Sequence, residues 1–418
     1  MDIQKILNIM RDCPCGKEHN LGHLVVEIEP GVLERTAEIL KVNGFPRKLL
    51  AVADKNTMNA ATGLPEILAK GGFQCEWKIF DNMRKADMTE VDALIRFCKN
   101  VDGVLSVGSG SLNDICRLAS FKINKEFAIF ATAPSMDGFA ANHAPITEHS
   151  FKKSFSCHAP SIIIGDTEIL AKAPAELKSA GFGDMVAKYV AIVDWKIAHL
   201  LIGEYYCPRV AELILDALQR VISLADKVTK NDQETAGSIM EALVMSGIAM
   251  SLTGCSRPAS GSEHMISHFW EIKKLEQHEL PDFHGKQVGV ATLMVAQLYH
   301  EIVNRTIVLF HDDSTDWDAV YAVYGPSFTN DIQECNIPAI TEEISPTMLR
   351  KQWSQIRKMI QSDLPSPASL LSLMQTAGAA TSIKEINITQ ELAEMGMLFH
   401  PYLRRRMTLT RLLPMVGN

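Results

Sequence analysis

Short hydrophobic runs alternate with segments of helical periodicity over roughly the first 165 residues of the chain. Strands and helices in turn predict a mostly parallel, doubly wound sheet with helices on both faces. The helical segments between the strands include residues 31–40 and 91–98. Ligands of such sheets bind at the carboxyl ends of the strands. The predicted strands are Leu24–Ile28, Leu49–Ala53, Cys75–Ile79, Gly103–Val107, Phe127–Ala131 and Ser161–Gly165.

The hydrophobic pattern changes near Asp166, where strand-like runs give way to long stretches of helical spacing. We therefore predict two domains: an α/β domain over residues 1–165 and an all-helical domain over residues 166–418. The predicted helices of the second domain include Asp184–Leu201, Val210–Val228, Gln233–Leu252, Val288–Ile302 and Thr347–Ile360.

Composition narrows the class of protein. Of the 418 residues, 47% are hydrophobic, yet no hydrophobic stretch approaches the roughly 18 residues of a membrane span. A net charge of -8 argues against a nucleic-acid partner. Nine scattered cysteines do not form the pattern of a disulfide framework. The polar N-terminus is also unlike a signal peptide, so we expect a cytoplasmic protein that does not insert into membranes.

A glycine-rich turn, Gly108–Asp114, follows a predicted strand and opens a predicted helix. It departs from the dinucleotide fingerprint G-x-G-x-x-G because Asn113 holds the last glycine position. Glycines still let backbone N–H groups approach a diphosphate, and the helix N-terminus supplies positive potential. The alternative is a glycine-rich turn without a ligand.

Two other strand ends favour the dinucleotide. Asp54 follows the second strand, where a carboxylate can accept the hydroxyls of an adenosine ribose, although it could equally cap the next helix. The segment Ala131–Gly138 ends the fifth strand with small and hydroxyl residues. If Asp54 meets the ribose, its charge would repel a 2′-phosphate, so we predict NAD as the preferred cofactor, with NADP possible.

Three side chains suited to a divalent ion lie in the second half: Asp184, His264 and His284. One carboxylate and two imidazoles leave coordination positions open, as a metal needs if it is to polarise a substrate oxygen. His268 lies four residues after His264 and shares its helix face. A buried histidine satisfied by its neighbours is the ordinary alternative for each position, but the clustering favours a site.

A second group of possible ligands lies near the N-terminus, at Cys13, Cys15, His19 and His23. The spacing C-x-C-x3-H-x3-H departs from the usual spacings of structural zinc sites. The pattern favours a polar N-terminal loop over a metal site.

In this order, five motifs make the chain resemble sn-glycerol-1-phosphate dehydrogenase in its bacterial branch, within the iron-containing alcohol dehydrogenase and dehydroquinate synthase superfamily. The resemblance runs from about Cys13 to Thr292 and implies the dehydroquinate synthase-like fold. It also implies a homo-oligomer, a dimer or larger. The motifs span residues 108–114 (GSGSLND), 132–138 (TAPSMDG), 181–188 (GFGDMVAK), 256–268 (SRPASGSEHMISH) and 284–292 (HGKQVGVAT).

The resemblance assigns roles to individual positions. The ligands of the metal, which is nickel or zinc, fall on Asp184, His264 and His284. Catalytic and substrate contacts fall on Asp137, Asp184 and His268. One departure is Ala141, where the family carries a serine at a cofactor contact; one lost hydroxyl removes a hydrogen bond at most. The implied cofactor contacts are Asp54, Gly110, Ser111, Leu112, Asn113, Asp114, Thr132, Ala133, Pro134, Ser135 and Ala141.

The implied reaction is the reversible reduction of dihydroxyacetone phosphate to sn-glycerol 1-phosphate, which feeds phospholipid and ether-lipid synthesis. Arg257 is our candidate anchor for the substrate phosphate, with Lys188 or Lys286 as alternatives; an ordinary surface arginine is the competing interpretation.

Three other functions remain open. A polyol dehydrogenase of the glycerol type would share Asp184, whereas a dehydroquinate synthase-like lyase usually has glutamate there, so Asp184 favours net redox chemistry. A non-catalytic nucleotide-binding protein would have lost the metal ligands.

Overall fold

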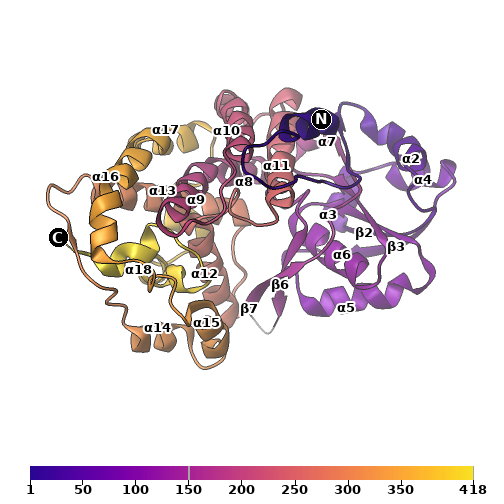
Figure 1. Ribbon diagram of the computed structural model, residues 1–418. Coiled ribbons are helices and arrows are strands. Elements are labelled where there is room, and N and C mark those ends of the chain that lie inside the picture. The colour runs from indigo at the N-terminus through magenta and orange to yellow at the C-terminus, as the bar shows by residue number, and fades with distance from the viewer. Residues whose placement is uncertain (149–150, 418) are drawn as a thin grey trace.

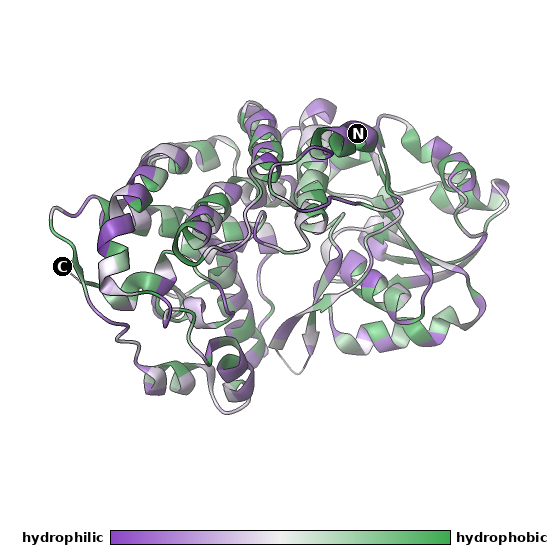
Figure 2. Ribbon diagram, viewed as in Figure 1, coloured by the Kyte–Doolittle hydropathy of each residue, from purple (hydrophilic) through white to green (hydrophobic). Residues whose placement is uncertain are grey.

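The computed structural model describes residues 1–148 and 151–417. A sheet-containing half and a helical half lie side by side, and the N-terminal segment reaches over both (Figure 1). Hydrophilic and hydrophobic residues alternate along the outer helices of both halves (Figure 2), as helices with one buried face require.

A six-stranded sheet in the order β1-β8-β5-β4-β2-β3 forms the first half, with every neighbouring pair parallel. All six predicted strands are confirmed, each to within one residue at either end. β4 is buried along its whole length, which is why its sequence is almost continuously apolar. The strands are β1 (Val25–Glu29), β2 (Lys48–Asp54), β3 (Gln74–Phe80), β4 (Gly103–Gly108), β5 (Glu126–Ala131) and β8 (Ile162–Asp166).

Helices cover both faces of this sheet, so the predicted doubly wound α/β class is confirmed. An antiparallel hairpin outside the sheet, β6 (His143–Glu148) and β7 (Phe151–Ser156), was not predicted. It extends toward the helical half and contacts it (Figure 1). The helices of this half are α1 (Ile3–Met10), α2 (Val32–Val42), α3 (Lys55–Ala60), α4 (Leu64–Lys70), α5 (Met88–Phe97) and α6 (Gly110–Lys122).

Helices dominate from Thr167 onward, with one addition, a two-residue ladder between β9 (Leu309–Phe310) and β10 (Val416–Gly417). The second half is therefore mostly helical rather than all-helical. Its helices are α7 (Thr167–Lys172), α8 (Ala175–Val186), α9 (Lys188–Ile202), α10 (Pro208–Ile222), α11 (Gln233–Thr253), α12 (Ser262–Glu276), α13 (His284–Val303), α14 (Trp317–Tyr324), α15 (Thr329–Asn336), α16 (Pro346–Asp363), α17 (Pro367–Thr376) and α18 (Gln390–Phe399).

Two helix predictions need correction. The stretch 184–201 is not one helix, because α8 ends at Val186 and α9 begins at Lys188. The stretch 210–228 overextends α10, which ends at Ile222. Within the described residues, α11 alone is long and apolar enough to cross a membrane, but 78% of its most apolar window is buried inside the protein. It is a core helix of this fold.

Candidate active site

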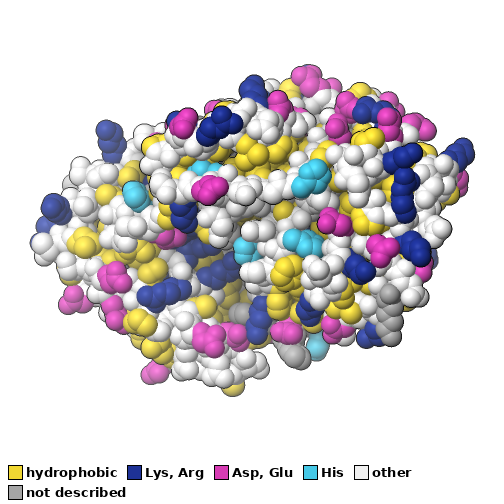
Figure 3. Space-filling view, turned by 45° about the vertical axis from the view of Figure 1, so that its right-hand side comes forward, with side chains coloured by type: hydrophobic (Ala, Val, Ile, Leu, Met, Phe, Trp, Pro, Cys, Tyr) yellow, Lys and Arg dark blue, Asp and Glu magenta, His cyan; other side chains and the backbone are white. Residues whose placement is uncertain are grey.

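A cavity of about 1010 Å³ separates the two halves. Strand ends and the loops that follow them line one side, and residues of α12 and the start of α13 line the other. The surface is hollowed between the halves, with lysine or arginine and histidine side chains around the hollow (Figure 3). This is the carboxyl edge of the parallel sheet, where such folds bind their ligands.

The three predicted metal ligands meet beside this cavity: His264 and His284 line it, and Asp184 is fully buried next to them. Asp184 comes from α8, His264 from the first turn of α12 and His284 from the first residue of α13. Their ligand atoms all lie within 4.8 Å of one another, and His264 Nε2 is 3.4 Å from Asp184 Oδ1. We call these three residues the catalytic cluster.

Two glycines let the supporting helices approach closely enough to form the catalytic cluster. A Cβ added to Gly183 would lie 2.8 Å from the Gly285 carbonyl oxygen. A Cβ added to Gly285 would lie 2.1 Å from the Ala180 carbonyl oxygen. Side chains at either position would therefore push α8 and α13 apart and separate Asp184 from His284.

Carboxylates brace both histidines of the catalytic cluster. His264 Nδ1 lies 2.7 Å from Glu263 Oε1, and His284 Nδ1 lies 3.2 Å from Glu271 Oε1. When each Nδ1 carries the proton, its N–H donates to the carboxylate, and the lone pair of each Nε2 is available to a cation. Such carboxylate–histidine pairs commonly stand behind metal sites, where they fix the ring and raise its basicity.

A second donor set, His268, Glu271 and His284, overlaps the first. We prefer Asp184 to Glu271 as the ligand, because Glu271 Oε2 accepts a bond from Lys152 Nζ at 2.5 Å and Oε1 accepts one from His284. Both oxygens of Glu271 are thus committed to supporting contacts.

The electrostatics of the catalytic cluster fit a bound cation. Burial lowers the pKa of His264, but hydrogen bonds to Asp184 and Glu263 outweigh burial and raise the pKa to about 9. Burial raises the pKa of Asp184, but the charges of Lys188 and His264 more than compensate and hold it well below its usual range. The site therefore favours positive charge beside Asp184, which a divalent ion would supply in place of the proton on His264.

Lys188 joins two predicted catalytic carboxylates. Its fully buried Nζ donates to Asp137 Oδ2 at 2.6 Å, to Asp184 Oδ1 at 3.2 Å and to the Ala259 carbonyl at 3.0 Å. The backbone N–H of Asp137 also donates to Asp184 Oδ2 at 3.0 Å. Asp137 is thereby fixed against Asp184.

His268 lies beside the catalytic cluster and lines the cavity. Its ring stacks on that of His284, with centroids 5.6 Å apart. Burial, followed by the charges of Lys152 and Arg404, holds the pKa of His268 well below its usual range. The ring is neutral at ordinary pH, so it can both accept and donate a proton or hydrogen bond.

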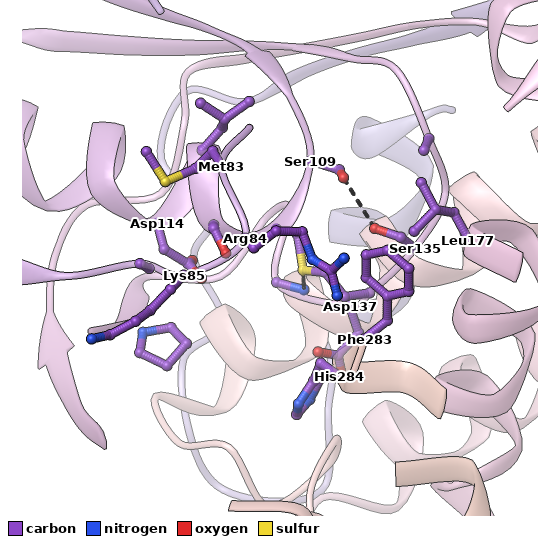
Figure 4. A pocket seen from close by; sticks show the side chains of 18 of the residues that line it. Met83, Arg84, Lys85, Ser109, Asp114, Ser135, Asp137, Leu177, Phe283 and His284 are labelled. Atoms are coloured by element: carbon purple, nitrogen blue, oxygen red, sulfur yellow. Dashed lines mark hydrogen bonds between the residues drawn. The ribbon is translucent and has the colours of Figure 1, made fainter. Parts of the chain in front are cut away.

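Most of the predicted cofactor contacts line the same cavity, on the strand ends and loops of the first half. Gly110, the first residue of α6, has φ +40°, a conformation that favours glycine. Ser135 Oγ donates to Ser109 Oγ at 3.1 Å, which ties the glycine turn to the end of β5 (Figure 4). The predicted residues that line the cavity are Asp54, Gly110, Ser111, Leu112, Asp114, Thr132, Ala133, Ser135 and Ala141.

Two predicted cofactor residues, Asn113 and Pro134, are absent from the described lining of the cavity. Asn113 is fully buried and accepts a bond from Ser106 Oγ at 2.7 Å, so it supports the turn from behind. Asp54 lines the cavity and also caps α3, because its Oδ1 accepts the Thr57 N–H at 2.8 Å. Its Oδ2 accepts the Met83 N–H at 3.1 Å. The helix-cap alternative is thus realised, and a ribose would have to share the carboxylate.

The structure does not support Arg257 as the phosphate anchor. Its guanidinium is buried and makes a two-pronged ion pair with Glu204, away from the cavity. The two alternative anchors are not supported either. Lys188 Nζ already donates to Asp137 and Asp184, and Lys286 Nζ pairs with Asp282 at 2.9 Å.

Two cations that sequence reasoning missed, Lys152 and Arg404, line the cavity near His268. Lys152 comes from β7, and Arg404 from the C-terminal segment after α18. Among described residues, Arg404 has no hydrogen-bond or ion-pair partner, whereas Lys152 pairs with Glu271. Arg404 is therefore available to an anionic ligand.

Arg84 spans the cavity on another side. Its guanidinium carbon lies 4.1 Å from the centre of the Phe283 ring, the residue before His284 (Figure 4). This contact joins the loop after β3 to the helical half and so crosses the gap between the halves.

The supporting carboxylates could have been found from the sequence. Glu271 follows His264 by seven residues and His268 by three, so all three lie on one face of α12. No comparable local signal marks Lys152 or Arg404, because only the fold brings their segments to the cavity.

Comparisons with known proteins agree with this geometry. Residues 27–174 match the family described as iron-containing alcohol dehydrogenase. The glycerol-1-phosphate dehydrogenase (NAD(P)+) of Geobacillus stearothermophilus is 30% identical over 404 residues, covering 94% of this chain and 93% of that protein. The enzyme of the same description from Halalkalibacterium halodurans is 33% identical over 324 residues, covering 75% of this chain and 80% of that protein.

The chain belongs to the glycerol-1-phosphate dehydrogenase family. It is an oxidoreductase of the iron-containing alcohol dehydrogenase group, and membership implies an NAD(P) cofactor and a divalent metal. The fold agrees: an archaeal Red Sea brine pool alcohol dehydrogenase superposes with a TM-score of 0.61 at 15% identity, covering 92% of this chain and 93% of that one. The dehydroquinate synthase-like fold is thereby confirmed.

Proposed function

We propose that the enzyme reduces dihydroxyacetone phosphate to sn-glycerol 1-phosphate, with consumption of one NADH and one proton, and that the reaction is reversible. The convergence of Asp184, His264 and His284 beside a cavity that the glycine turn also lines is the observation that supports this most. With both groups bound, the ion, nickel or zinc, supplies Lewis acidity to a ketone oxygen and the reduced nicotinamide supplies hydride.

The residues of the chain do the positioning. Lys188 holds Asp184 and Asp137 in place by donating a hydrogen bond to each carboxylate. Ser246 Oγ donates to Asp137 Oδ2 at 2.9 Å, which leaves Oδ1 of Asp137 for a substrate hydroxyl. Neutral His268 would orient the substrate and exchange the proton that the product alcohol requires.

The substrate phosphate would bind at Arg404, with Lys152 beside it. Both cations line the cavity with His268, whose pKa is lowered by burial and then by their charges, so a three-carbon substrate near His268 would bring its phosphate to them. A guanidinium without a carboxylate partner is well suited to bind phosphate through two hydrogen bonds.

The cofactor would lie along Gly110–Asp114 and Thr132–Ser135, with Asp54 at the adenosine ribose. The charge of Asp54 favours NAD over NADP, since a 2′-phosphate would be repelled. We further propose that the reaction takes place in the cytoplasm and supplies a glycerol phosphate backbone for lipid synthesis. All nine cysteines are free thiols in the structure, which suits a reducing compartment.

A panel of ketones tests these assignments. Dihydroxyacetone phosphate and dihydroxyacetone would each be assayed with NADH and with NADPH, in the presence and absence of added nickel or zinc. The phosphorylated ketone should be preferred, because a cationic contact to phosphate contributes about 1.5–3 kcal/mol, roughly tenfold or more.

Arg404→Ala should remove most of that preference while activity on dihydroxyacetone remains. Arg405→Ala is the matched control, because Arg405 is the exposed neighbour of Arg404 and donates to the Pro338 carbonyl outside the cavity. Equal rates on both ketones in the parent enzyme would favour a polyol dehydrogenase, and turnover without net NADH consumption would favour a lyase.

A further inference from the structure

Four potential metal ligands meet outside the cavity, on the segment between α1 and β1 and at the start of α10. Cys13, Cys15 and His19 belong to the segment, and Cys207 precedes α10. Their ligand atoms all lie within 4.8 Å of one another. We call these four residues the thiol cluster.

The distances match those expected around one small ion. Cys13 Sγ lies 3.3 Å from Cys207 Sγ, Cys15 Sγ lies 3.1 Å from His19 Nε2, and Cys207 Sγ lies 3.8 Å from His19 Nε2. Tetrahedral zinc, with bonds of about 2.3 Å to sulfur and about 2.0 Å to nitrogen, separates its ligands by roughly 3.5–3.8 Å. The side chains need only small rotations to reach this geometry.

The orientation of His19 supports the same conclusion. Its Nδ1 lies 2.9 Å from the Leu252 carbonyl oxygen in the last turn of α11. A carbonyl only accepts, so the proton is on Nδ1 and the lone pair is on Nε2, which faces the sulfurs. A backbone carbonyl behind the distal nitrogen is a frequent partner of a metal-bound histidine.

We propose that the thiol cluster is a closed zinc site of three thiolates and one imidazole, separate from the catalytic cluster. The spacing-based interpretation of this region as a simple polar loop is therefore replaced. Sequence spacing misled because the fourth ligand is Cys207, 188 residues beyond His19, and not His23, which is exposed. Four protein ligands leave no open position, as is usual for structural zinc.

The site would fasten the N-terminal segment to the helical half. Cys207 fixes it to α10, and the His19–Leu252 bond fixes it to the end of α11 (Figure 1). The ring of Tyr205 adds two contacts, its hydroxyl 3.2 Å from Cys15 Sγ and its face 3.8 Å from Lys17 Nζ. After α11 the chain continues into the loop that leads to His264 on α12. The ion would therefore stabilise the end of α11, next to this loop, without contacting the cavity.

Cobalt substitution tests the proposal in the full-length protein. Thiolate-bound Co²⁺ absorbs strongly through sulfur-to-metal charge transfer, and the catalytic cluster contains no sulfur ligand. Protein purified under reducing conditions and titrated with Co²⁺ should develop this band up to a single ion per chain. The signal does not depend on enzymatic activity, so it is separate from the proposed function.

Four variants define the source of the band. Cys207→Ser should lose most of it, as should Cys15→Ser, whose position in an irregular segment makes misfolding a lesser concern. Cys75→Ser, a half-buried cysteine in β3, is the matched control and should keep the full band, as should His284→Ala.

Three outcomes would overturn the proposal. The first is no charge-transfer band in reduced protein. The second is a band that survives both Cys15→Ser and Cys207→Ser. The third is a Cys13–Cys207 disulfide that persists in the reduced preparation and excludes metal.

Discussion

The catalytic cluster and the thiol cluster each bring distant side chains around a space of ionic size, yet they are built differently. The catalytic cluster offers one carboxylate and two imidazoles, faces a large cavity and is surrounded by Lys188, Glu263 and Glu271. The thiol cluster offers three sulfurs and one imidazole, lies outside the cavity and is supported by a backbone carbonyl.

Ligand number and surroundings therefore separate the two roles. Three ligands beside a cavity leave a coordination position for a substrate oxygen. The charged neighbours orient the ligands and tune the affinity for a cation that exchanges its remaining ligands during a reaction. Four ligands with few charged neighbours hold an ion that has only to remain bound. The comparison predicts that perturbing one cluster leaves the other intact.

Loss of a catalytic ligand should have the largest effect. His264→Ala should lower turnover by about a thousandfold, since Lewis-acid polarisation contributes several kcal/mol to the transition state. NADH binding, measured by fluorescence titration, should survive, because the cofactor contacts lie on the other half. His278→Ala, an exposed histidine outside the cavity, is the control. Near-normal activity and metal content in His264→Ala would remove His264 from the ligand set.

Acid should weaken metal binding at the catalytic cluster. The pKa of His264 is raised to about 9 in the metal-free protein, so below that pH a proton occupies the nitrogen that the metal needs. Each pH unit below the pKa then costs about tenfold in affinity, and the apparent Kd for nickel or zinc should rise about a hundredfold from pH 8 to pH 6. Competition with a chelator measures this. A flat profile would mean that His264 is neutral before the metal binds.

A smaller effect is expected from the carboxylate behind His284. Glu271→Gln keeps an acceptor for Nδ1 but removes the charge, and such changes cost about 10–100-fold in metal affinity. Glu276→Gln, at the exposed end of the same helix, is the control because it pairs with Lys273 outside the cavity. If both variants bind metal equally well, Glu271 does not support the site.

The sequence predicted the sheet well because its strands are buried on both faces. β2 and β4 are apolar over nearly their whole length, and no helix-forming spacing competes with them. The break between α8 and α9 was not predictable in this way. The chain turns there so that Lys188 can reach Asp137, Asp184 and Ala259, and local periodicity does not encode those contacts.

Site prediction depended on how far apart the partners lie in the chain. Helical spacing indicated His264 and His268, and the position after a predicted strand indicated the glycine turn. The geometry does not support Arg257, because Glu204, 53 residues away, pairs with its guanidinium. Cys207 was overlooked for the same reason, since a ligand 194 residues from Cys13 leaves no spacing pattern.

The smallest effect on turnover should come from the thiol cluster. Cys15→Ser should leave kcat unchanged, because Cys15 and its ligand partners do not line the cavity in the described structure. At a zinc concentration about a hundred times Kd, the bound ion stabilises the fold by about 2.7 kcal/mol, so its loss should lower the Tm of a chain of this length by about 3 °C. Thermal unfolding of wild type and Cys15→Ser in zinc, or of wild type with a chelator, does not isolate this contribution, because the ion at the catalytic cluster also stabilises the protein. The His284→Ala background removes that contribution, and Cys15→Ser should lower Tm there by the same amount.

An unchanged Tm in both backgrounds would mean that the thiol cluster holds no stabilising ion, and a large fall in kcat would mean that the two clusters are coupled.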